Sequence, residues 1–275
     1  MKKKKMLTFP NAKINLGLRI IEKRPDGFHN IETIFIPVPV CDILEIIPVN
    51  TDSSLTTSGL AVEGALTDNI CLKALTLFQR EIGCSNVAMH LHKIIPTGAG
   101  LGGGSSDAAF TLKLLASLFS PKISHRKLLT MASQLGSDCA FFIENTPSIA
   151  TGKGEVLQAI EIDLHNHYLV LVSPRIHVST AEAYNGIIPK QPAHSLQEFI
   201  HQPIKNWQNT IVNDFEITAF KANPALQQIK EKLIHLGAVY AAMTGSGSTI
   251  FGLFKQDPGD LSNNFVGSEL FAARL

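Results

Sequence analysis

The chain has 275 residues, of which 45% are hydrophobic and 17% are charged, and its formal net charge is +1. A chain of this length buries roughly 75% of the surface that it exposes when unfolded, so a compact protein of one or two domains is expected. The balanced charge argues against a dedicated nucleic-acid surface, and the apolar runs are far too short to span a bilayer.

Cysteine spacing and the N-terminal charges bear on the cellular compartment. The lysine run at residues 2–5 is not followed by the long apolar stretch of a secretory signal, and the four cysteines show no C-x-x-C spacing. A cytoplasmic protein with reduced thiols is therefore expected. His90 and His92 could ligate a metal from one strand face, but no third ligand is apparent nearby, which favours two solvent-facing histidines.

The first predicted element is a strand over Phe9 to Ile21, where apolar residues alternate with others. Such a strand presents Lys13 and Asn15 on the same face. The sequence Arg-Pro-Asp-Gly at residues 24–27 predicts a turn. A second strand is expected to start at residues 28–29 and to run to about residue 40.

A third strand is predicted over residues 42–48, followed by a polar loop or hairpin over residues 50–59. Apolar residues at helical spacing then indicate a helix that starts near residue 70. Either Thr67 or Asp68 could cap this helix, and a capping role alone would also explain Asn69.

Glycine dominates the stretch from Pro96 to Ala109, which reads PTGAGLGGGSSDAA. A strand pattern over residues 87–91 precedes it, and apolar residues at helical spacing follow it over residues 108–119. At such a junction, glycine allows positive φ and close approach of the backbone to a ligand. The N-terminus of the helix adds unpaired N–H groups and a positive dipole end. The stretch therefore predicts an anion site, and the usual anion is phosphate.

Known glycine patterns fit this stretch only in part. Gly98, Gly100 and Gly103 satisfy G-x-G-x-x-G, but a second helical pattern follows instead of the strand and acidic residue of a dinucleotide fold. Residues 104–106 are Gly-Ser-Ser, so the lysine of a Walker P-loop is missing. A glycine-rich turn without a ligand is the remaining alternative.

Beyond the glycine stretch, a helix is predicted over Ser124 to Leu135, with Gly136 at its C-terminal end. Asp138 follows, and an aspartate at such a position is most often a cap for the next helix. Residues 150–155 are predicted to form a turn at a domain junction. An apolar strand is expected over residues 168–173.

Four further elements complete the prediction. Ser179 and Thr180 could cap a short helix, and a longer helix is expected over residues 224–236 with proline at its first position. Residues 238–254 have the pattern of a strand, a glycine turn and a strand. Residues 261–275 have the pattern of a weak terminal helix.

Six motifs, taken together, resemble the GHMP kinases, the family of galactokinase, homoserine kinase and mevalonate kinase. They are PNAKINL from residue 10, DGFH from residue 26, PTGAGLGGGSS from residue 96, LGSD from residue 135, VSTAEAY from residue 178 and TGSGS from residue 244. The triple glycine at residues 102–104 narrows the resemblance. It points to the branch that phosphorylates a cytidine diphosphate derivative of methylerythritol in the non-mevalonate route to isoprenoids.

The resemblance implies an α+β fold of two domains. An ATP-binding domain related to domain 2 of ribosomal protein S5 would span residues 1–155, and a ferredoxin-like α/β sandwich domain would span residues 156–275. The implied reaction transfers the γ-phosphoryl group of ATP, with Mg²⁺, to the 2-hydroxyl of the methylerythritol unit. A small-molecule substrate, no nucleic-acid or membrane partner, and a monomer or weak homodimer are expected.

The resemblance also implies roles for individual residues. Lys13 and Asp138 would be catalytic. The ATP site would comprise Asn69, Pro96, Gly98, Gly100, Leu101, Gly102, Gly103, Gly104, Ser105 and Ser106. The substrate site would comprise Asn15, Phe28, His29, Thr180 and Tyr184. No metal ligand is implied. Relatives usually carry tyrosine at the position of Phe28, so a contact of the phenol hydroxyl would be lost here while stacking is kept. They commonly carry proline at the position of Ala140, and its replacement would shift the backbone slightly but keep the carboxylate of Asp138.

Phosphoryl transfer depends mainly on positioning and charge stabilisation. Asp138 would accept the hydroxyl proton, and Lys13 would hold Asp138 ionised and draw the alkoxide into line. The charge of Asp107 would repel the phosphates although it favours the start of the helix. Another GHMP small-molecule kinase and a non-catalytic nucleotide-binding module are the alternatives. The aromatic residues of the implied cytosine site argue against the first, and the presence of both catalytic residues argues against the second.

Overall fold

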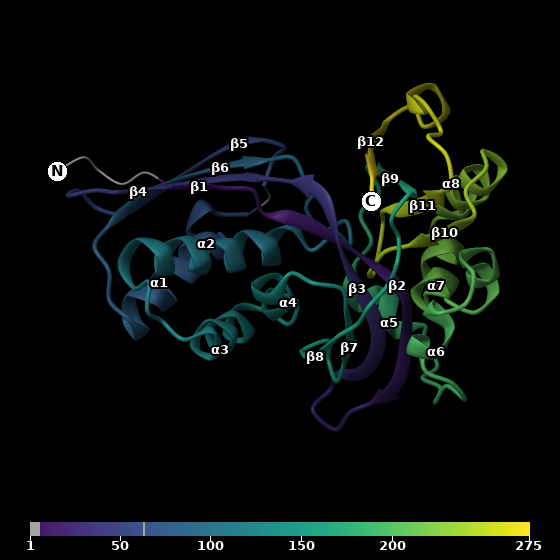
Figure 1. Cartoon of the computed structure of the whole chain (residues 1–275), viewed down its shortest axis with the longest axis horizontal. Coiled ribbons are helices and arrows are strands. Elements are labelled where there is room, and N and C mark those ends of the chain that lie inside the picture. The colour runs from purple at the N-terminus through teal and green to yellow at the C-terminus, as the bar shows by residue number, and fades with distance from the viewer. Residues whose placement is uncertain (1–5, 63) are drawn as a thin grey trace. The chain divides into compact units, whose positions relative to one another are not determined.

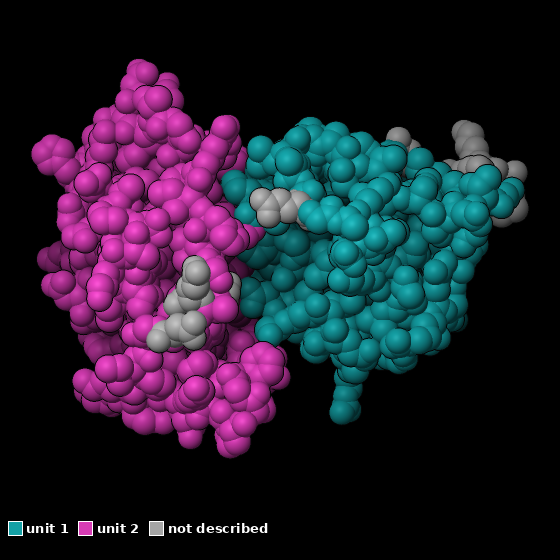
Figure 2. All heavy atoms as spheres, turned by 180° about the vertical axis from the view of Figure 1, so that it is seen from behind, with its two compact units in different colours: residues 1–12, 40–97, 102–146 teal, residues 13–39, 98–101, 147–275 magenta. Residues whose placement is uncertain are grey.

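The computed structural model describes residues 6–62 and 64–275, and the chain divides into two compact units. Unit 1 comprises residues 1–12, 40–97 and 102–146, and unit 2 comprises residues 13–39, 98–101 and 147–275 (Figure 2). The chain passes between the units several times, so they do not coincide with the expected division at residue 155. That division stays a prediction about domains.

Unit 1 is a four-stranded sheet packed against helices (Figure 1). The strand order is β1 (Met6–Thr8), β4 (Ile43–Pro48), β6 (Val87–Lys93) and β5 (Ser54–Gly59). The helices are α1 (Ile70–Glu81), α2 (Gly103–Phe119), α3 (His125–Leu135) and α4 (Cys139–Glu144), with a 3₁₀ turn at Leu66–Asp68. Helix α2 contacts β1 and β4 and is flanked by the other three helices. The expected polar loop at residues 50–59 contains strand β5, which pairs in parallel with β6.

The core of unit 1 follows the predicted periodicities. On β6, Val87, Met89 and Leu91 are buried whereas His90 is exposed, as expected for a strand with one covered face. Helix α2 buries ten of its 17 residues, because neighbouring helices cover sides that the sheet does not. The loop at residues 94–102 therefore joins a half-buried strand to a buried helix, as the sequence predicts.

Unit 2 contains two further four-stranded sheets. The first has the order β2 (Asn11–Lys23), β3 (His29–Cys41), β7 (Ser148–Thr151) and β8 (Val156–Ala159). The second has the order β10 (Tyr240–Met243), β11 (Ile250–Phe254), β9 (Tyr168–Pro174) and β12 (Ser268–Arg274), with every pair antiparallel. Its helices are α5 (Thr180–Asn185), α6 (Leu196–Ile200), α7 (Phe215–Ala222) and α8 (Pro224–His235), with 3₁₀ helices at Ile204–Asn209 and Ser262–Asn264.

The predicted terminal helix at residues 261–275 is wrong. Residues 268–274 form strand β12, which pairs with β9 over its whole length. Weak helical periodicity cannot compete with a complete ladder of hydrogen bonds to a neighbouring strand. In the described part of the chain, no helix has both the length and the apolar character that a membrane crossing requires.

Strand β10 lies at the edge of its sheet, and side chains cover its free backbone groups. The Gln208 amide donates to the Ala241 carbonyl oxygen and accepts from the Ala241 N–H, both at 3.0 Å. The Glu216 carboxylate accepts from the Met243 N–H at 2.8 Å. These bonds tie β10 to the helical segments before it and fix the strand that leads into the glycine turn at residue 244.

Candidate active site

The glycine loop has the backbone geometry that the sequence predicts. Gly98, Gly100 and Gly102 have φ values of 67°, 78° and 71°, a region that side-chain-bearing residues rarely occupy. Helix α2 begins at Gly103, and its N-cap residue Gly102 has no side chain that could accept a hydrogen bond from the first N–H groups. The Ser106 hydroxyl in its first turn is buried without a hydrogen-bond partner among the described residues.

The two glycines that open α2 differ in their surroundings. A Cβ atom added to Gly103 would lie 2.9 Å from Ile95 Cγ2 and 3.3 Å from Lys93 Nζ, so this glycine is required by packing inside unit 1. A Cβ atom added to Gly104 would meet nothing within 4 Å. The open space at Gly104 is therefore where a ligand can approach the helix.

A cavity of about 370 Å³ lies beside this first turn, within unit 1. Its lining includes Gly104 and Asn69, two residues predicted for the ATP site, together with Thr97, Lys93 and Asp107. The Asn69 side chain also accepts a hydrogen bond from the Cys71 N–H at 2.9 Å and so caps α1. The capping role of Asn69 is therefore confirmed, and its role in the ATP site stays a prediction.

A buried charge cluster forms one wall of this cavity. The Lys93 ammonium contacts the Asp42 carboxylate and lies 2.7 Å from Asp107 Oδ2. Asp42 also accepts hydrogen bonds from the N–H groups of Ile94 and Ile95, at 2.6 and 2.9 Å. The other oxygen of Asp107, Oδ1, is buried and has no hydrogen-bond partner among the described residues. Asp107 is thus turned towards Lys93, which answers the sequence-based question of how its charge is tolerated.

The protonation of this cluster follows from its burial. Burial raises the pKa of Asp107, and Lys93 opposes that shift without overcoming it. For Lys93, burial lowers the pKa, but the two carboxylates outweigh it and the pKa is raised. One ammonium thus faces two carboxyl groups, and the cluster holds protons more tightly than separate residues would.

Asp138 occupies the N-cap position of α4, yet its side chain makes no capping hydrogen bond. The interpretation of this residue as a helix cap is therefore wrong in its geometry, although the position is right. The carboxylate is half-buried in unit 1. Burial raises the pKa of the adjacent Cys139 thiol to about 12, so this cysteine stays protonated near neutral pH and is a poor nucleophile.

Lys13 and Asn15 lie on the same face of β2, as predicted, and both are buried in unit 2. The Lys13 ammonium donates to Asn15 Oδ1 at 2.6 Å and to the Gly100 carbonyl oxygen at 3.1 Å, and it lies 5.0 Å from the centre of the Phe35 ring. The Asn15 amide nitrogen donates to the Thr33 hydroxyl at 2.8 Å. Both ends of the Asn15 amide are thus engaged within the protein, which indicates a supporting role for a residue predicted to contact substrate.

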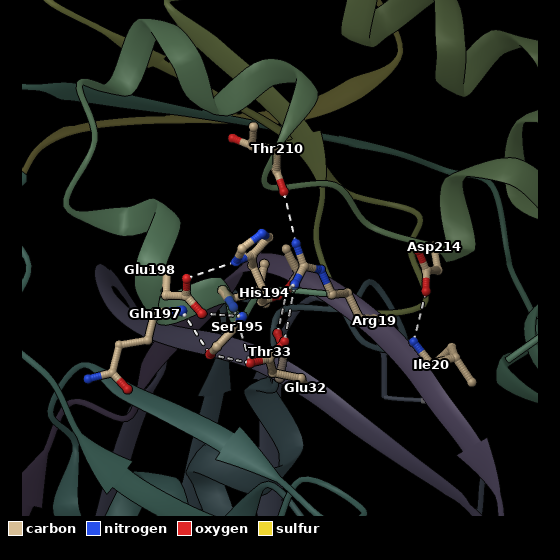
Figure 3. A network of polar contacts seen from close by, with 12 residues as sticks. Arg19, Ile20, Glu32, Thr33, His194, Ser195, Gln197, Glu198, Thr210 and Asp214 are labelled. Atoms are coloured by element: carbon tan, nitrogen blue, oxygen red, sulfur yellow. Dashed lines mark hydrogen bonds and ion pairs between the residues drawn. The ribbon is translucent and has the colours of Figure 1, made fainter. Parts of the chain in front are cut away.

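The strand that carries Lys13 is held by a polar network around Arg19 (Figure 3). Arg19 pairs with Glu32 at 3.3 Å and donates to the carbonyl oxygens of His194 and Thr210, at 2.6 and 3.1 Å. Glu32 in turn accepts from the Ser195 hydroxyl at 2.5 Å.

Further along β2, the same strand is anchored to the segment that precedes α7. The Ile20 N–H donates to Asp214 Oδ2 at 2.8 Å (Figure 3), and the Asp214 N–H donates to the Leu18 carbonyl oxygen at 2.8 Å. The network and these bonds together fix β2 against distant parts of unit 2.

Two of the predicted substrate residues are in direct contact. The rings of His29 and Tyr184 stack with centroids 4.7 Å apart and planes 18° from parallel, and Tyr184 also packs edge-on against Phe215. The stacked rings leave no room for a base between them in this structure. Burial lowers the pKa of His29, and Lys23 adds to that shift, so the imidazole is neutral near pH 7. Phe28 is 58% exposed, with the Lys153 ammonium 4.7 Å from its ring centre.

Thr180 and the histidine pair of residues 90 and 92 add little to the candidate site. Thr180 begins α5, but its side chain lies outside the described part of the structure. His90 and His92 share hydrogen bonds with the hydroxyl of Ser58, and the described residues contain no group of three or more histidine, cysteine or acidic side chains that could hold a metal.

Sequence reasoning missed Asp42 and Lys93, and it included Thr244 in the TGSGS motif without giving it a role of its own. The first two are separated by 51 positions and meet only because β4 and β6 are paired. Thr244 looks like an ordinary turn residue in the sequence. Its burial and its contacts with Asn15 and Gly100 appear only in the fold.

Models of two domain families match the chain. The GHMP kinases N terminal domain matches residues 69–145, which include the glycine loop, α2 and Asp138. The GHMP kinases C terminal domain matches residues 195–265.

Several proteins resemble the chain over nearly its whole length. The 4-diphosphocytidyl-2-C-methyl-D-erythritol kinase of Bacteroides fragilis is 46% identical over 98% of this chain and 100% of its own length. The enzyme of the same name from Cytophaga hutchinsonii is 48% identical over 94% of this chain and 96% of its own.

Solved structures show the same likeness. A crystal structure of 4-(cytidine 5'-diphospho)-2C-methyl-D-erythritol kinase superimposes with a TM-score of 0.82, at 29% identity over 97% of this chain and 98% of that chain. A homoserine kinase from Cytophaga hutchinsonii superimposes with a TM-score of 0.74 over 100% of this chain and 96% of that chain, but at 16% identity it shows the fold alone.

Proposed function

The chain belongs to the GHMP kinases, and within them to the 4-diphosphocytidyl-2-C-methyl-D-erythritol kinases, and from this premise we propose how its residues carry out the reaction. The activity is ATP-dependent phosphorylation of the 2-hydroxyl of 4-(cytidine 5'-diphospho)-2-C-methyl-D-erythritol, a step of the non-mevalonate route of isoprenoid precursor biosynthesis. The observation that carries the assignment of residues is the glycine loop, whose three positive-φ glycines lead directly into the uncapped N-terminus of α2.

The loop and the first turn of α2 bind the ATP phosphates in this proposal. Backbone N–H groups at a helix N-terminus attract anions, both as donors and through the positive end of the helix dipole. The absence of a side chain at Gly104 leaves the approach to these groups open. Gly98, Gly100 and Gly102 supply the curvature, and Gly103 supplies the close packing of α2 on Ile95.

The cavity of unit 1 receives the nucleoside end of ATP. It begins at Gly104, where the phosphates are proposed to lie, and its polar wall contains Asn69, Lys93 and Asp107. The Oδ1 atom of Asp107, which has no hydrogen-bond partner in the described part of the chain, is a buried acceptor, or a donor when the carboxyl group is protonated. Buried polar atoms normally find partners, so a polar group of the nucleoside that bonds to this oxygen would satisfy it.

Mg²⁺ fits this arrangement through the phosphates. A magnesium ion bound to ATP keeps several waters and needs few protein ligands. The hydroxyl of Ser106 is buried and has no hydrogen-bond partner among residues 6–62 and 64–275, which favours such an ion at the helix start, since this hydroxyl could contact either a phosphate oxygen or the metal. When bound, the ion neutralises the charge that develops on the phosphates.

Asp138 and Lys13 carry the proton and charge chemistry. Asp138 accepts the proton of the 2-hydroxyl, because its half-buried carboxylate is not used as a helix cap. Lys13 stabilises the alkoxide that results, because it is a buried cation held in a fixed orientation by Asn15 and Gly100. General-base catalysis of this kind contributes about 10²–10⁴ in rate.

The acceptor's cytosine stacks on the aromatic surface of His29, Tyr184 and Phe28. The rings of His29 and Tyr184 are stacked on each other, so the base would stack on an outer face of this pair, and a neutral imidazole suits an uncharged pyrimidine. A base on such a face is worth about 1–3 kcal/mol. This binding energy comes from a contact far from the reacting hydroxyl, and it serves to orient that hydroxyl for the reaction. Asn15 and Thr180, which were also expected at the substrate, stay predictions in that role.

The test is a coupled assay of ADP release with three acceptors: the cytidine diphosphate derivative of methylerythritol, homoserine and mevalonate. We expect turnover of the first alone, and phosphorus NMR of the product should show a new phosphomonoester on the methylerythritol unit. Equal turnover of homoserine or mevalonate would reduce the assignment to the kinase family. The cytoplasmic location and the monomeric or weakly dimeric state stay predictions, which fractionation and sedimentation of the native protein can test.

A further inference from the structure

Thr244 contacts two residues of the candidate site within unit 2, Asn15 and Gly100. It is fully buried in the turn between β10 and β11. Its hydroxyl accepts a hydrogen bond from the Asn15 N–H at 3.0 Å. The same hydroxyl lies 3.1 Å from Asn15 Oδ1 and 3.1 Å from the Gly100 carbonyl oxygen, and it can donate to either.

The Lys13 ammonium uses the same two acceptors as Thr244. It donates to Asn15 Oδ1 at 2.6 Å and to the Gly100 carbonyl oxygen at 3.1 Å. Each of these oxygens has two lone pairs and can serve both donors. The ammonium and the hydroxyl therefore share one pair of acceptors, and the position of each acceptor is coupled to both donors.

The surroundings hold this arrangement rigidly. Asn213 donates to the carbonyl oxygens of Met243 and Gly245, both at 2.8 Å, and thereby fixes the turn on either side of Thr244. Gly100 packs so closely on the turn that an added Cβ atom would collide with the Thr244 carbonyl oxygen. The glycine turn at residues 244–248 is thus a support for the loop that contains Gly100.

Resting on the proposed function, we propose that Thr244 is a positioning residue for phosphoryl transfer. Its hydroxyl orients Asn15 Oδ1 and the Gly100 carbonyl oxygen so that they hold the Lys13 ammonium in its working position. Loss of the hydroxyl removes the single O–H donor that these two buried acceptors share, and it leaves the Asn15 N–H without its acceptor, so Lys13 can move. Misplacement of a catalytic group by about 1 Å can cost roughly 100-fold in rate. The hydroxyl contacts Asn15 and the carbonyl oxygen of Gly100, whereas the donors proposed for the ATP phosphates are backbone N–H groups at the start of α2.

The kinetic test compares isosteric substitutions at two buried threonines of one hairpin. Thr244→Val removes the hydroxyl with little change of shape, and Thr244→Ser keeps it. Thr249→Val is the matched control, because the hydroxyl of Thr249 is also buried but donates to Ser173 at 3.1 Å, away from Lys13. We expect Thr244→Val to lower kcat roughly 10- to 100-fold with little change in the KM for ATP. Thr244→Ser and Thr249→Val should stay close to the wild type.

A double variant tests whether Thr244 acts through Asn15. If it does, Asn15→Ala combined with Thr244→Val should lose no more activity than Asn15→Ala alone, because the two residues belong to one chain of contacts. Fully additive losses would overturn the proposal. So would equal losses in Thr244→Val and Thr249→Val, because they would show only a general sensitivity of the hairpin.

A spectroscopic arm is independent of turnover. The ¹⁵N resonance of the Lys13 ammonium, assigned by its disappearance in Lys13→Met, should shift or broaden in Thr244→Val and stay unchanged in Thr249→Val. An unchanged resonance in both variants would overturn the coupling. If the resonance responds as expected but the wild type does not phosphorylate the cytidine substrate, the proposed function fails while the coupling stands.

Discussion

Substitution of Gly104 by alanine should separate the stability of the protein from its affinity for ATP. Gly104 is the second residue of α2, and an added Cβ atom meets nothing within 4 Å. Replacement of a helical glycine by alanine in open space stabilises the folded state by about 0.5–1 kcal/mol. For a protein of this size, that gain raises the thermal midpoint by about 1–4 °C.

The same methyl group should weaken ATP binding. Side chains of a helix tilt towards its N-terminus, so a methyl group at Gly104 points towards the groups proposed to receive the phosphates. We expect the Kd for ATP to rise at least tenfold, which is about 1.4 kcal/mol. The substitution is thus expected to raise the stability of the protein and to lower its affinity for ATP, so partial unfolding could not explain the lower affinity.

Calorimetric titration with ATP and thermal unfolding of the same samples provide the measurement. Gly103→Ala is the contrasting variant, because its methyl group would press on Ile95 and Lys93. Overpacking of this kind costs about 1–3 kcal/mol, so the thermal midpoint should fall. A Gly104→Ala protein that is more stable and still binds ATP with the affinity of the wild type would refute the assignment of the first turn of α2 to the phosphates.

Three further predictions concern other groups of the site. Asp138→Asn should lower kcat by about 10²–10⁴ while ATP still binds, and a near-normal kcat would remove Asp138 from the role of base. Tyr184→Ala should reduce kcat/KM for the cytidine substrate roughly tenfold or more, with little effect on the already poor turnover of methylerythritol phosphate; equal losses on both acceptors would argue against stacking. Burial raises the pKa of Asp107, so the folded state binds a proton more tightly than the unfolded chain and the free energy of unfolding falls as pH rises above the ordinary aspartate range. Asp107→Asn should flatten that slope in denaturant titrations between about pH 5 and pH 7, and parallel slopes for the two proteins would contradict this origin.

The parts of the site that depend on local sequence could be predicted. The glycine loop, its strand and its helix follow from periodicity and from the conformational freedom of glycine, and the shared face of Lys13 and Asn15 follows from the two-residue repeat of a strand. The charge cluster of Lys93, Asp42 and Asp107 could not, because its members meet only after strands distant in the sequence have paired.

Other predictions failed where tertiary contacts decide between local alternatives. The residues of strand β12 were expected to form a helix. Their local sequence does not reveal that β9 pairs with them. Asp138 stands where a cap is expected, and the sequence cannot tell whether its carboxylate turns back to the helix. The substrate role of Asn15 stays a prediction, and the sequence could not show that its amide is also engaged by Lys13 and Thr33.

The side-chain cover on β10 has a consequence for the protein at high concentration. A bare edge strand is a template on which another chain can add a strand, and repeated addition leads to aggregates. The Gln208 amide imitates one peptide unit of a neighbouring strand by donating to and accepting from Ala241. This end of the sheet is therefore closed to a further strand without the help of a second subunit. We therefore expect loss of the Gln208 amide to lower the yield of soluble protein and its stability on storage before it changes any catalytic constant.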